Sequence, residues 1–427
     1  MKISIIFMVI NIYLLITYYK KKKITIELLT LVIAFEIFFQ IGFALKIKNI
    51  YISMNDILML YLLVYTLLSY GMTKIRVEVI ILAVLCILGY LNFLIFPPNY
   101  KLFPITGNFD KQFIYRDQLH FVSLTLNNVF RCIIFFVYLL AVSITFKNLK
   151  KIELLKLKNN IFNLGKIQLV ILMIEFVTKY TNTYLLIFPK FIKIFGENKI
   201  YQFGFQRVRD GAYWLQGFCL EPGYVAFGLL IYLLSIPKQR YEKLWIGLGI
   251  LFLILNRSLT SAVIFSFYIL ILLSLLKSNK KLKIILYILI LIPIILTIVD
   301  ITPYIKRIEN IFSNNSTAKS ENIRKYHLIL GIEYIIRRPL LGYSLGTTRG
   351  LSFVISSLEN IGILGTFFWW RLHYKLTRLS IIYSVILILL FVIIGTIENL
   401  YGFLIILILL LIRLKKEEIT QQLRSVT

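Results

Sequence analysis

The sequence is poor in the residues that build disulfide frameworks and metal sites. It contains 3 cysteines and 3 histidines among 427 residues. Cys86, Cys132 and Cys219 each stand alone, without the paired spacing of zinc ligands or the even set of a disulfide scaffold. The acidic residues form no cluster with the spacing of a magnesium site. We therefore expect no structural disulfide, no metal and no cofactor.

Acidic residues are also scarce relative to basic ones. There are 20 Asp and Glu against 48 Lys and Arg, which gives a formal net charge of +28. In a soluble protein this excess would indicate nucleic-acid binding. Here most basic residues stand in short connections between apolar blocks, where they indicate membrane topology instead. We expect membrane lipids, and no nucleic acid, among the partners.

What the sequence does contain is long apolar blocks. Hydrophobic residues make up 59% of the chain and the mean hydropathy is +0.82, whereas ordinary soluble domains are nearer half apolar. Blocks of roughly 17 to 22 residues are long enough for a helix to cross a hydrocarbon core of about 30 Å. They predict an all-α fold, a polytopic transmembrane helix bundle that forms a single integral membrane domain over residues 1–427. The candidate spans, about thirteen in all, lie near 3–19, 26–45, 54–72, 77–97, 121–146, 161–188, 223–237, 244–256, 259–276, 284–300, 351–370, 380–397 and 399–412.

The connections between the blocks alternate in character. Every second one is short and basic, beginning with 20–23, and the positive-inside rule assigns these to the cytoplasm. The first block, 1–19, is interpreted as a span and not as a signal peptide, because no small-residue cleavage pattern follows it. Three long segments then face outward, 97–120, 189–222 and 301–350, and the last is a large helical extracytoplasmic loop. Long loops are uncommon unless functional, so we expect the chemistry on this face.

The first polar cluster ends the second long loop. Arg207 and Arg209 precede a stretch rich in glycine and aromatic residues that ends in Glu221-Pro222. Proline is favoured at the first position of a helix and a carboxylate suits the helix dipole, so a plain helix start accounts for Glu221. The functional alternative is that both arginines converge with Glu221 on a polar ligand at the membrane surface.

The second cluster is a polar turn between two spans, Asn256-Arg257-Ser258, followed by Thr260 and Ser261. An arginine at a helix end often extends to lipid headgroups, which is the structural explanation. The functional alternative is that Arg257 points into the mouth of the bundle and binds phosphate.

The third cluster lies in the last long loop. Arg324, His327, Gly331, Tyr334 and Arg338 fall within an arc of about 80° on a helix. The structural alternative is an interfacial helix whose basic face meets anionic headgroups. A stripe that carries His and Tyr around a Gly favours a binding role instead.

Arginine groups on the outer side suit one ligand in particular. Arginine forms bidentate bonds to phosphate and does not lose its proton. Arginines beside a leaving pyrophosphate would stabilise the charge that develops as its bond to a sugar breaks. Such a site needs no metal.

These segments resemble the bacterial O-antigen ligase and Wzy polymerase superfamily. The similar motifs are, in order, Gly217-Phe218-Cys219-Leu220-Glu221-Pro222, Asn256-Arg257-Ser258, the loop segment 324–346 and the helix 357–365. The likeness covers roughly residues 200–370, and the first half resembles the family as a series of spans. Ligases also carry a His-Asn pair ahead of the last motif. Residues 350–353 contain no His, which favours a polymerase over a ligase.

The resemblance implies glycosyl transfer between two glycans carried on undecaprenyl pyrophosphate, at the outer face of the bacterial inner membrane. A hydroxyl of the acceptor attacks the anomeric carbon of the donor chain, and undecaprenyl pyrophosphate leaves. The implied partners are undecaprenyl-pyrophosphate-linked oligosaccharides, a flippase and a chain-length regulator.

The resemblance also implies roles for individual residues. The arginines assigned to the pyrophosphates are Arg207, Arg209, Arg257, Arg324 and Arg338. The family arginine lies closer to the Gly-aromatic pair than Arg209 does, so Arg207 and Arg209 are both retained. The base stays open between Glu221 and His327.

Other functions remain as alternatives. A flippase for the same lipid-linked oligosaccharide would show broken helices or paired repeats near mid-membrane. Another type of membrane glycosyltransferase uses an acidic pair in its first outer loop, and residues 46–55 lack one. A scaffolding protein would not explain the polar stripe. Charges within spans are functional by default, and Glu36, Arg131, Glu175 and Lys179 rank second to the three clusters.

Overall fold

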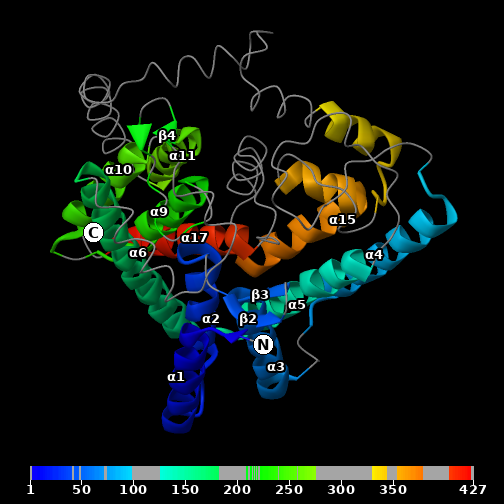
Figure 1. Cartoon of the computed structure of the whole chain (residues 1–427), viewed down its shortest axis with the longest axis horizontal. Coiled ribbons are helices and arrows are strands. Elements are labelled where there is room, and N and C mark those ends of the chain that lie inside the picture. The colour runs from blue at the N-terminus through cyan, green and yellow to red at the C-terminus, as the bar shows by residue number, and fades with distance from the viewer. Residues whose placement is uncertain are drawn as a thin grey trace. The chain divides into compact units, whose positions relative to one another are not determined.

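The computed structural model describes residues 2–40, 43–47, 50–71, 75–98, 126–181, 208–209, 212–213, 215, 217, 219, 222–238, 240–256, 258–275, 329–343, 353–377 and 403–424. Figure 1 shows the chain coloured from its N-terminus to its C-terminus. The chain forms two compact units. The first consists of Met1–Thr66, Leu149–Asp300 and Leu410–Thr427, and the second of Leu67–Asn148 and Ile301–Leu409.

The first unit contains most of the described helices, wholly or in their larger part. They are α1 (Ile5–Lys21), α2 (Thr25–Ile33), the π-helix η1 (Ala34–Phe38), α3 (Met54–Tyr70), α6 (Lys151–Tyr180), α9 (Pro222–Ser235), α10 (Glu242–Leu255), α11 (Leu259–Leu275) and α17 (Phe403–Arg424).

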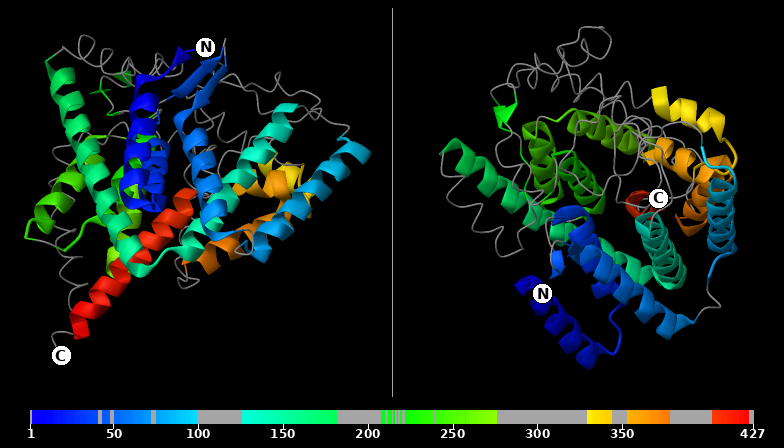
Figure 2. Two further views of the ribbon diagram at one scale, coloured as in Figure 1. Left: turned by 90° about the horizontal axis from the view of Figure 1, so that it is seen from below. Right: turned by 45° about the vertical axis from the view of Figure 1, so that its right-hand side comes forward.

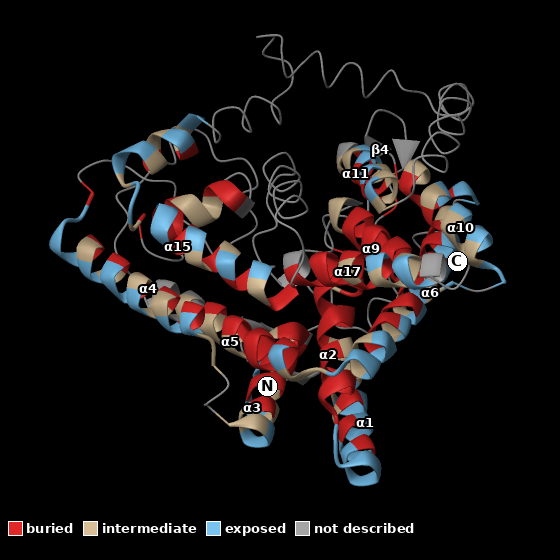
Figure 3. Ribbon diagram, turned by 180° about the vertical axis from the view of Figure 1, so that it is seen from behind, coloured by how far each residue is buried: buried red, intermediate tan, exposed pale blue. Residues whose placement is uncertain are grey.

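Helix α9 forms the core of the first unit. Its apolar residues from Val225 to Leu234 are at most 2% exposed, and Figure 3 shows the helix in the colour of buried residues. A helix that is apolar all round must be covered on every side. Helices α6, α10, α11 and η1 provide that cover. Pro222 begins α9 because its fixed φ and missing N–H suit the first helical position.

The C-terminal half of helix α6 buries several polar residues and exposes several apolar ones. Gln168, Glu175 and Lys179 are buried, whereas Val170 and Met173 are exposed. The surface helix of a soluble protein shows the opposite pattern. An exposed apolar face of this kind suits contact with lipid.

A small sheet interrupts the helical fold where a span was expected. The predicted span 26–45 does not continue as one α-helix, because α2 passes into η1 at Ala34 and the chain then forms strand β2 (Phe43–Ile47). Strand β2 pairs antiparallel with β1 (Lys2–Ile3) and β3 (Ile50–Ser53). These segments are rich in Ile, Phe and Tyr, which favour extended backbone.

The second unit contains α4 (Val77–Ile95), α5 (Leu126–Asn148), a helix at residues 329–337 and α15 (Phe353–Thr377). Helix α4 lies against both α15 and α5 (Figure 2). Helix α15 contains a break at Gly362, where φ is 65° and ψ is −175°.

Two predicted basic connections are helical instead. Helix α6 begins at Lys151, so the basic stretch 151–158 belongs to it. Glu153 Oε2 accepts the backbone N–H of Lys150 at 2.8 Å, which caps the start of this helix. Helix α15 likewise continues through residues 371–377. Lys, Arg, Leu and Glu are good helix formers, so the helices extend past the apolar blocks.

Two of the described helices, α4 and α6, are long and apolar enough to cross a membrane. Shorter apolar helices are Met54–Tyr70, Cys132–Asn148, Gly223–Ser235 and Thr260–Leu275. The prediction of a helical fold is therefore confirmed for the described residues, apart from the short strands. The bundle of about thirteen spans and the three outer loops, 97–120, 189–222 and 301–350, stay predictions.

Candidate functional site

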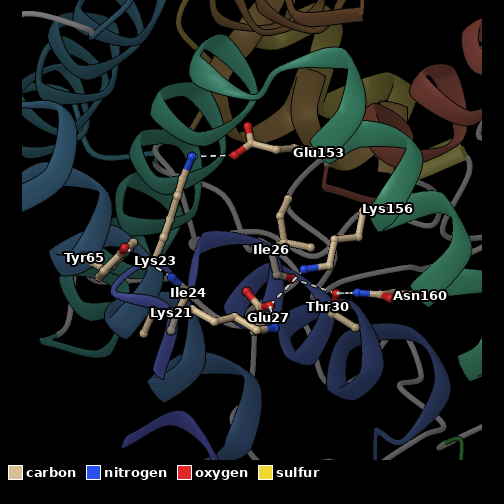
Figure 4. A network of polar contacts seen from close by, with 10 residues as sticks. All are labelled: Lys21, Lys23, Ile24, Ile26, Glu27, Thr30, Tyr65, Glu153, Lys156 and Asn160. Carbon is tan, nitrogen blue, oxygen red and sulfur yellow. Dashed lines mark hydrogen bonds and ion pairs between the residues drawn. The ribbon is translucent and has the colours of Figure 1, made fainter. Parts of the chain in front are cut away.

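Basic residues of the first unit gather at one end of α6, where carboxylates hold them. Glu27 Oε1 on α2 lies 2.9 Å from Lys21 Nζ and 3.1 Å from Lys156 Nζ (Figure 4). Lys23 pairs with Glu153 beside them. Glu27 is buried and both of its lysines are exposed. The hydrogen bond that Lys21 donates to Glu27, together with the negative charge of Glu27, raises the pKa of Lys21.

The C-terminal helix α17 joins the same end of the unit. The buried Lys158 pairs with Glu418. Lys415 Nζ donates to the carbonyl of Ile236 at 3.0 Å and lies 3.4 Å from Glu242 Oε1. The C-terminal helix is thereby tied to α6 and to the connection between α9 and α10.

Four predicted basic connections thus meet at one end of the first unit. They are the segments 20–23, 147–158, 238–243 and 413–416. Basic connections gathered on a single side are what the positive-inside rule expects of a membrane protein.

Toward the other end of α6, a buried ion pair contacts Gly217 in the second long loop. Glu175 Oε1 lies 2.6 Å from Lys179 Nζ, and Glu175 Oε2 accepts the backbone N–H of Gly217 at 2.7 Å. Glu175 is 0% exposed and Lys179 is 8% exposed. Glu175 lies about 25 Å along the helix from Lys158, at 1.5 Å per residue. The Gly217 turn and the basic end are therefore separated by nearly the thickness of a hydrocarbon core.

Cys219 adds a second attachment for this turn. Its Sγ lies 3.5 Å from the carbonyl oxygen of Ile37 in η1 and 3.8 Å from Nε2 of Gln168 in α6. Gly217 itself has a φ of +57°, a left-handed conformation that favours glycine. The start of the Gly-aromatic motif is thus held against both α6 and η1.

The first turn of α9, which follows the first polar cluster, lies beside the first turn of α11, which follows Arg257 of the second. A β-carbon on Gly223, in the first turn of α9, would lie 3.4 Å from Thr260 Oγ1 in the first turn of α11. Ser258 Oγ accepts the N–H of Ser261 at 3.0 Å and lies 2.8 Å from the Ser261 hydroxyl, as an N-cap does. Two helix N-termini thus meet, and such ends favour a bound anion.

Most of the predicted site residues lie outside the described residues. These are Arg207, Glu221, Arg257, Arg324 and His327.

The chain beside two of these residues is described. Pro222 directly follows Glu221, and Ser258 directly follows Arg257. The backbone of Arg209 lies in strand β4 (Val208–Arg209), where it pairs with Ala212 of β5 (Ala212–Tyr213). The structure brings the segments that follow Glu221 and Arg257 together, and the convergence of the side chains stays a prediction.

In the second unit, the described part of the polar stripe faces protein. Tyr334 is 3% exposed. A β-carbon on Gly331 would lie 2.6 Å from Oε1 of Glu359 in α15. Ile332 and Ile336, away from the stripe, are exposed, the latter by 71%. In an interfacial helix with its polar face toward headgroups, the polar stripe would be exposed and the isoleucines covered. The described part of this helix shows the opposite, so the alternative of a headgroup-binding helix does not hold for these residues.

Arg338, the last residue of the stripe, is held by aromatic rings and by the end of α4. Its Nη2 donates to the carbonyl of Phe96. The guanidinium carbon lies 5.2 Å from the ring centre of Tyr343 and 5.8 Å from that of Phe93, within cation–π range. The next residue back, Arg337, is exposed and forms a surface ion pair one turn earlier. The role of Arg338 as a pyrophosphate ligand stays a prediction.

The break in α15 is where this loop helix docks. At Gly362 the helical hydrogen bonding stops, and the chain that follows the loop helix supplies new partners. The N–H of Ile363 donates to the carbonyl of Pro339 at 2.8 Å, and the N–H of Tyr343 donates to the carbonyl of Glu359 at 2.7 Å. Irregular backbone in apolar surroundings persists only where its polar groups find such partners.

Two buried carboxylates were not among the predicted site residues. Glu359 is 2% exposed and lies next to Gly331. It falls within the recognised motif 357–365 but was not singled out there. Glu175 belongs to the charges within predicted spans, a group that ranked second because several of its members lie near the edges of those spans. Its spacing of four residues from Lys179 is that of a helical ion pair, and this signal marks it in the sequence.

Among the residues that the structure describes, no group of three or more His, Cys, Asp or Glu side chains is arranged to hold a metal ion. No protein-family model matches this chain, and a comparison with curated proteins finds no significant match. The residues themselves therefore carry the functional inference.

Proposed function

We propose that this protein is a polysaccharide polymerase of the bacterial inner membrane with its active site on the extracytoplasmic face. It transfers a growing glycan from undecaprenyl pyrophosphate to an incoming lipid-linked repeat unit of an O-antigen, capsule or exopolysaccharide. It acts with a chain-length regulator and after a flippase that delivers the repeat units. Arginines, rather than a metal ion, neutralise the pyrophosphate.

The contact between Gly223 and Thr260 carries this proposal. These residues follow the two motifs that contain Glu221 and Arg257, and they stand in the first turns of α9 and α11. Arg257 directly precedes Ser258, and an arginine beside two helix N-termini would favour a phosphate group. Glu221 directly precedes Pro222, and a carboxylate there would be suited to accept the proton of an attacking hydroxyl.

The proposed reaction uses one residue as a base and several arginines to stabilise the leaving group. The acceptor hydroxyl attacks the anomeric carbon of the donor and passes its proton to Glu221 or His327. The bond between the anomeric carbon and the pyrophosphate oxygen breaks, and undecaprenyl pyrophosphate leaves. Arg257 and Arg324, with Arg207 or Arg209 and Arg338, stabilise the charge on the departing group.

The arrangement along α6 supports the sidedness of the proposal. The basic connections lie at one end of this helix, and the Gly217 turn lies about 25 Å away. With the basic end in the cytoplasm, the turn and the starts of α9 and α11 belong to the outer surface. Lipid-linked sugars presented at that surface would reach them.

The test is a double substitution in cells that lack the wild-type gene. R257A/R324A is expected to leave single repeat units where the wild-type protein restores long chains, while protein levels stay equal. The control is R337A, because Arg337 is exposed and pairs with Glu333 at the surface. Unchanged chain lengths in R257A/R324A would refute the proposal.

One observation favours a second candidate, a flippase for the same lipid-linked oligosaccharide. Helix α15 is broken at Gly362, and transporters bind their substrates at broken helices. At this break, however, the backbone groups of Ile363 and Glu359 bond to the chain's own residues 339–343. This favours a docking point for a loop over a substrate site.

A further inference from the structure

The carboxylate of Glu175 joins two parts of the first unit that are distant in sequence. One oxygen lies 2.6 Å from Lys179 in the same helix, and the other accepts the N–H of Gly217 at 2.7 Å. Gly217 begins the motif that ends in Glu221-Pro222. The carboxylate therefore reaches from the wall of the bundle to the chain that carries a proposed catalytic residue.

A requirement for stability alone does not explain this ion pair. Both charged side chains are buried, and they belong to α6, one of the described helices that are long and apolar enough to cross a membrane. The free energy needed to remove two charges from water often exceeds the free energy gained from their attraction. Replacing a buried ion pair by apolar residues is therefore commonly neutral or stabilising. Ionisable groups in such surroundings are generally tied to function.

The attachment lies close to the proposed chemistry. Glu221 is four residues after Gly217 and directly precedes Pro222, the first residue of α9. Gly217 is held by Glu175, and α9 is the buried core of the unit. The short segment that contains Glu221 is therefore fixed at both ends.

We propose that Glu175 is a positioning residue for the glycosyl transfer proposed above. Its carboxylate holds the Gly217 turn and so sets where the chain presents Glu221, while Lys179 pairs with the other oxygen of that carboxylate. The inference rests on the proposed function, but it concerns a residue that does not itself touch substrate.

The test separates the hydrogen bond to Gly217 from the charge pair. In E175L/K179M both charges are replaced by apolar side chains, so the fold is kept while Gly217 loses its acceptor. In E175Q/K179M the charges are also gone, but the amide oxygen still accepts the Gly217 N–H. Each variant is expressed as the full chain in cells lacking the wild-type gene, and polymer length, protein level and thermal stability are measured.

The polymer formed by E175L/K179M is expected to fall on the order of ten- to a hundred-fold, the loss that a misplaced group causes. E175Q/K179M is expected to recover most of the polymer at equal stability. Wild-type polymer from E175L/K179M would overturn the positioning role. Failure of the wild-type gene itself to restore polymer would instead overturn the proposed function.

A third variant keeps the proposal testable if E175L/K179M does not accumulate. K179M removes the lysine but leaves the acceptor of the Gly217 N–H in place. A positioning role predicts that K179M loses much less polymer than E175A. Equal losses from the two would show that the ion pair, and not the bond to Gly217, matters.

Discussion

Oε1 of Glu359 lies 2.6 Å from the point that a β-carbon on Gly331 would occupy. A β-carbon there would also lie 2.7 Å from Cγ2 of Ile355, so a side chain at residue 331 would require Glu359 and Ile355 of α15 to shift. This contact helps to set how the helix 329–337, which carries Tyr334 and is followed by Arg338, lies against α15. Glycine at residue 331 therefore allows the close approach of this helix to α15.

Alanine at Gly331 is expected to displace the loop helix from α15. Polymer formation should fall by about ten-fold or more, because small displacements of a binding group are costly. The matched control is G247A, since a β-carbon on Gly247 in α10 meets nothing within 4 Å. Polymer lengths in cells measure both, and normal polymer from G331A would contradict the docking described here.

The neighbouring arginines Arg338 and Arg337 form a second matched pair. Arg338 donates to the carbonyl of Phe96 and lies over two aromatic rings, so R338A removes contacts that hold the loop helix to α4. We expect shorter polymer from R338A. R337A should behave as wild type, because an exposed ion pair contributes about 0–1 kcal/mol. Equal behaviour of the two variants would argue against an inward-facing stripe.

The left-handed glycine in α15 is expected to be intolerant of a side chain. Gly362 has a φ of +65°, and a β-carbon there would collide with the carbonyl of Leu340. The matched residue is Gly71, with a φ of +73° and open space around it. G71A should lower stability by the conformational cost of about 1–2 kcal/mol, and G362A by clearly more. Thermal unfolding of the purified variants in detergent checks this, and equal shifts would contradict it.

A buried carboxylate in the second unit joins α4 to α15. Glu78 Oε1 lies 2.5 Å from Lys375 Nζ and 3.3 Å from Arg371 Nε. E78Q is expected to lower the free energy of unfolding by about 1–3 kcal/mol, the range for hydrogen bonds to charged groups. E333Q, which alters an exposed pair, serves as the control. An unchanged melting temperature in E78Q would show that this pair adds nothing to stability.

The sequence predicted the helical character and the gathering of basic connections well. Apolar blocks and basic flanks are local signals, and residues 20–23 and 413–416 do meet at one end of the first unit. The stripe of Gly331, Tyr334 and Arg338 was also predicted from helical periodicity. Its inward direction was not, because periodicity shows that residues share a face but not what the face meets.

The carboxylates that hold the motifs depend on contacts between distant segments. Glu175 and Gly217 are 42 residues apart, and no local pattern relates them. The break of α15 at Gly362 depends likewise on residues 339–343, which complete its hydrogen bonding. The span expected at 26–45 was predicted too long. The strand at Phe43–Ile47 forms by pairing with neighbouring strands, and an apolar block in the sequence does not reveal that pairing.

Reconstitution tests the central claim most directly. The purified full chain is placed in liposomes that contain one undecaprenyl-pyrophosphate-linked oligosaccharide on the outward-facing side of the protein, with no other protein. The account predicts glycans of increasing length and release of undecaprenyl pyrophosphate, both abolished in R257A/R324A. Movement of the lipid-linked oligosaccharide between leaflets with no joining of units would contradict it and identify a flippase.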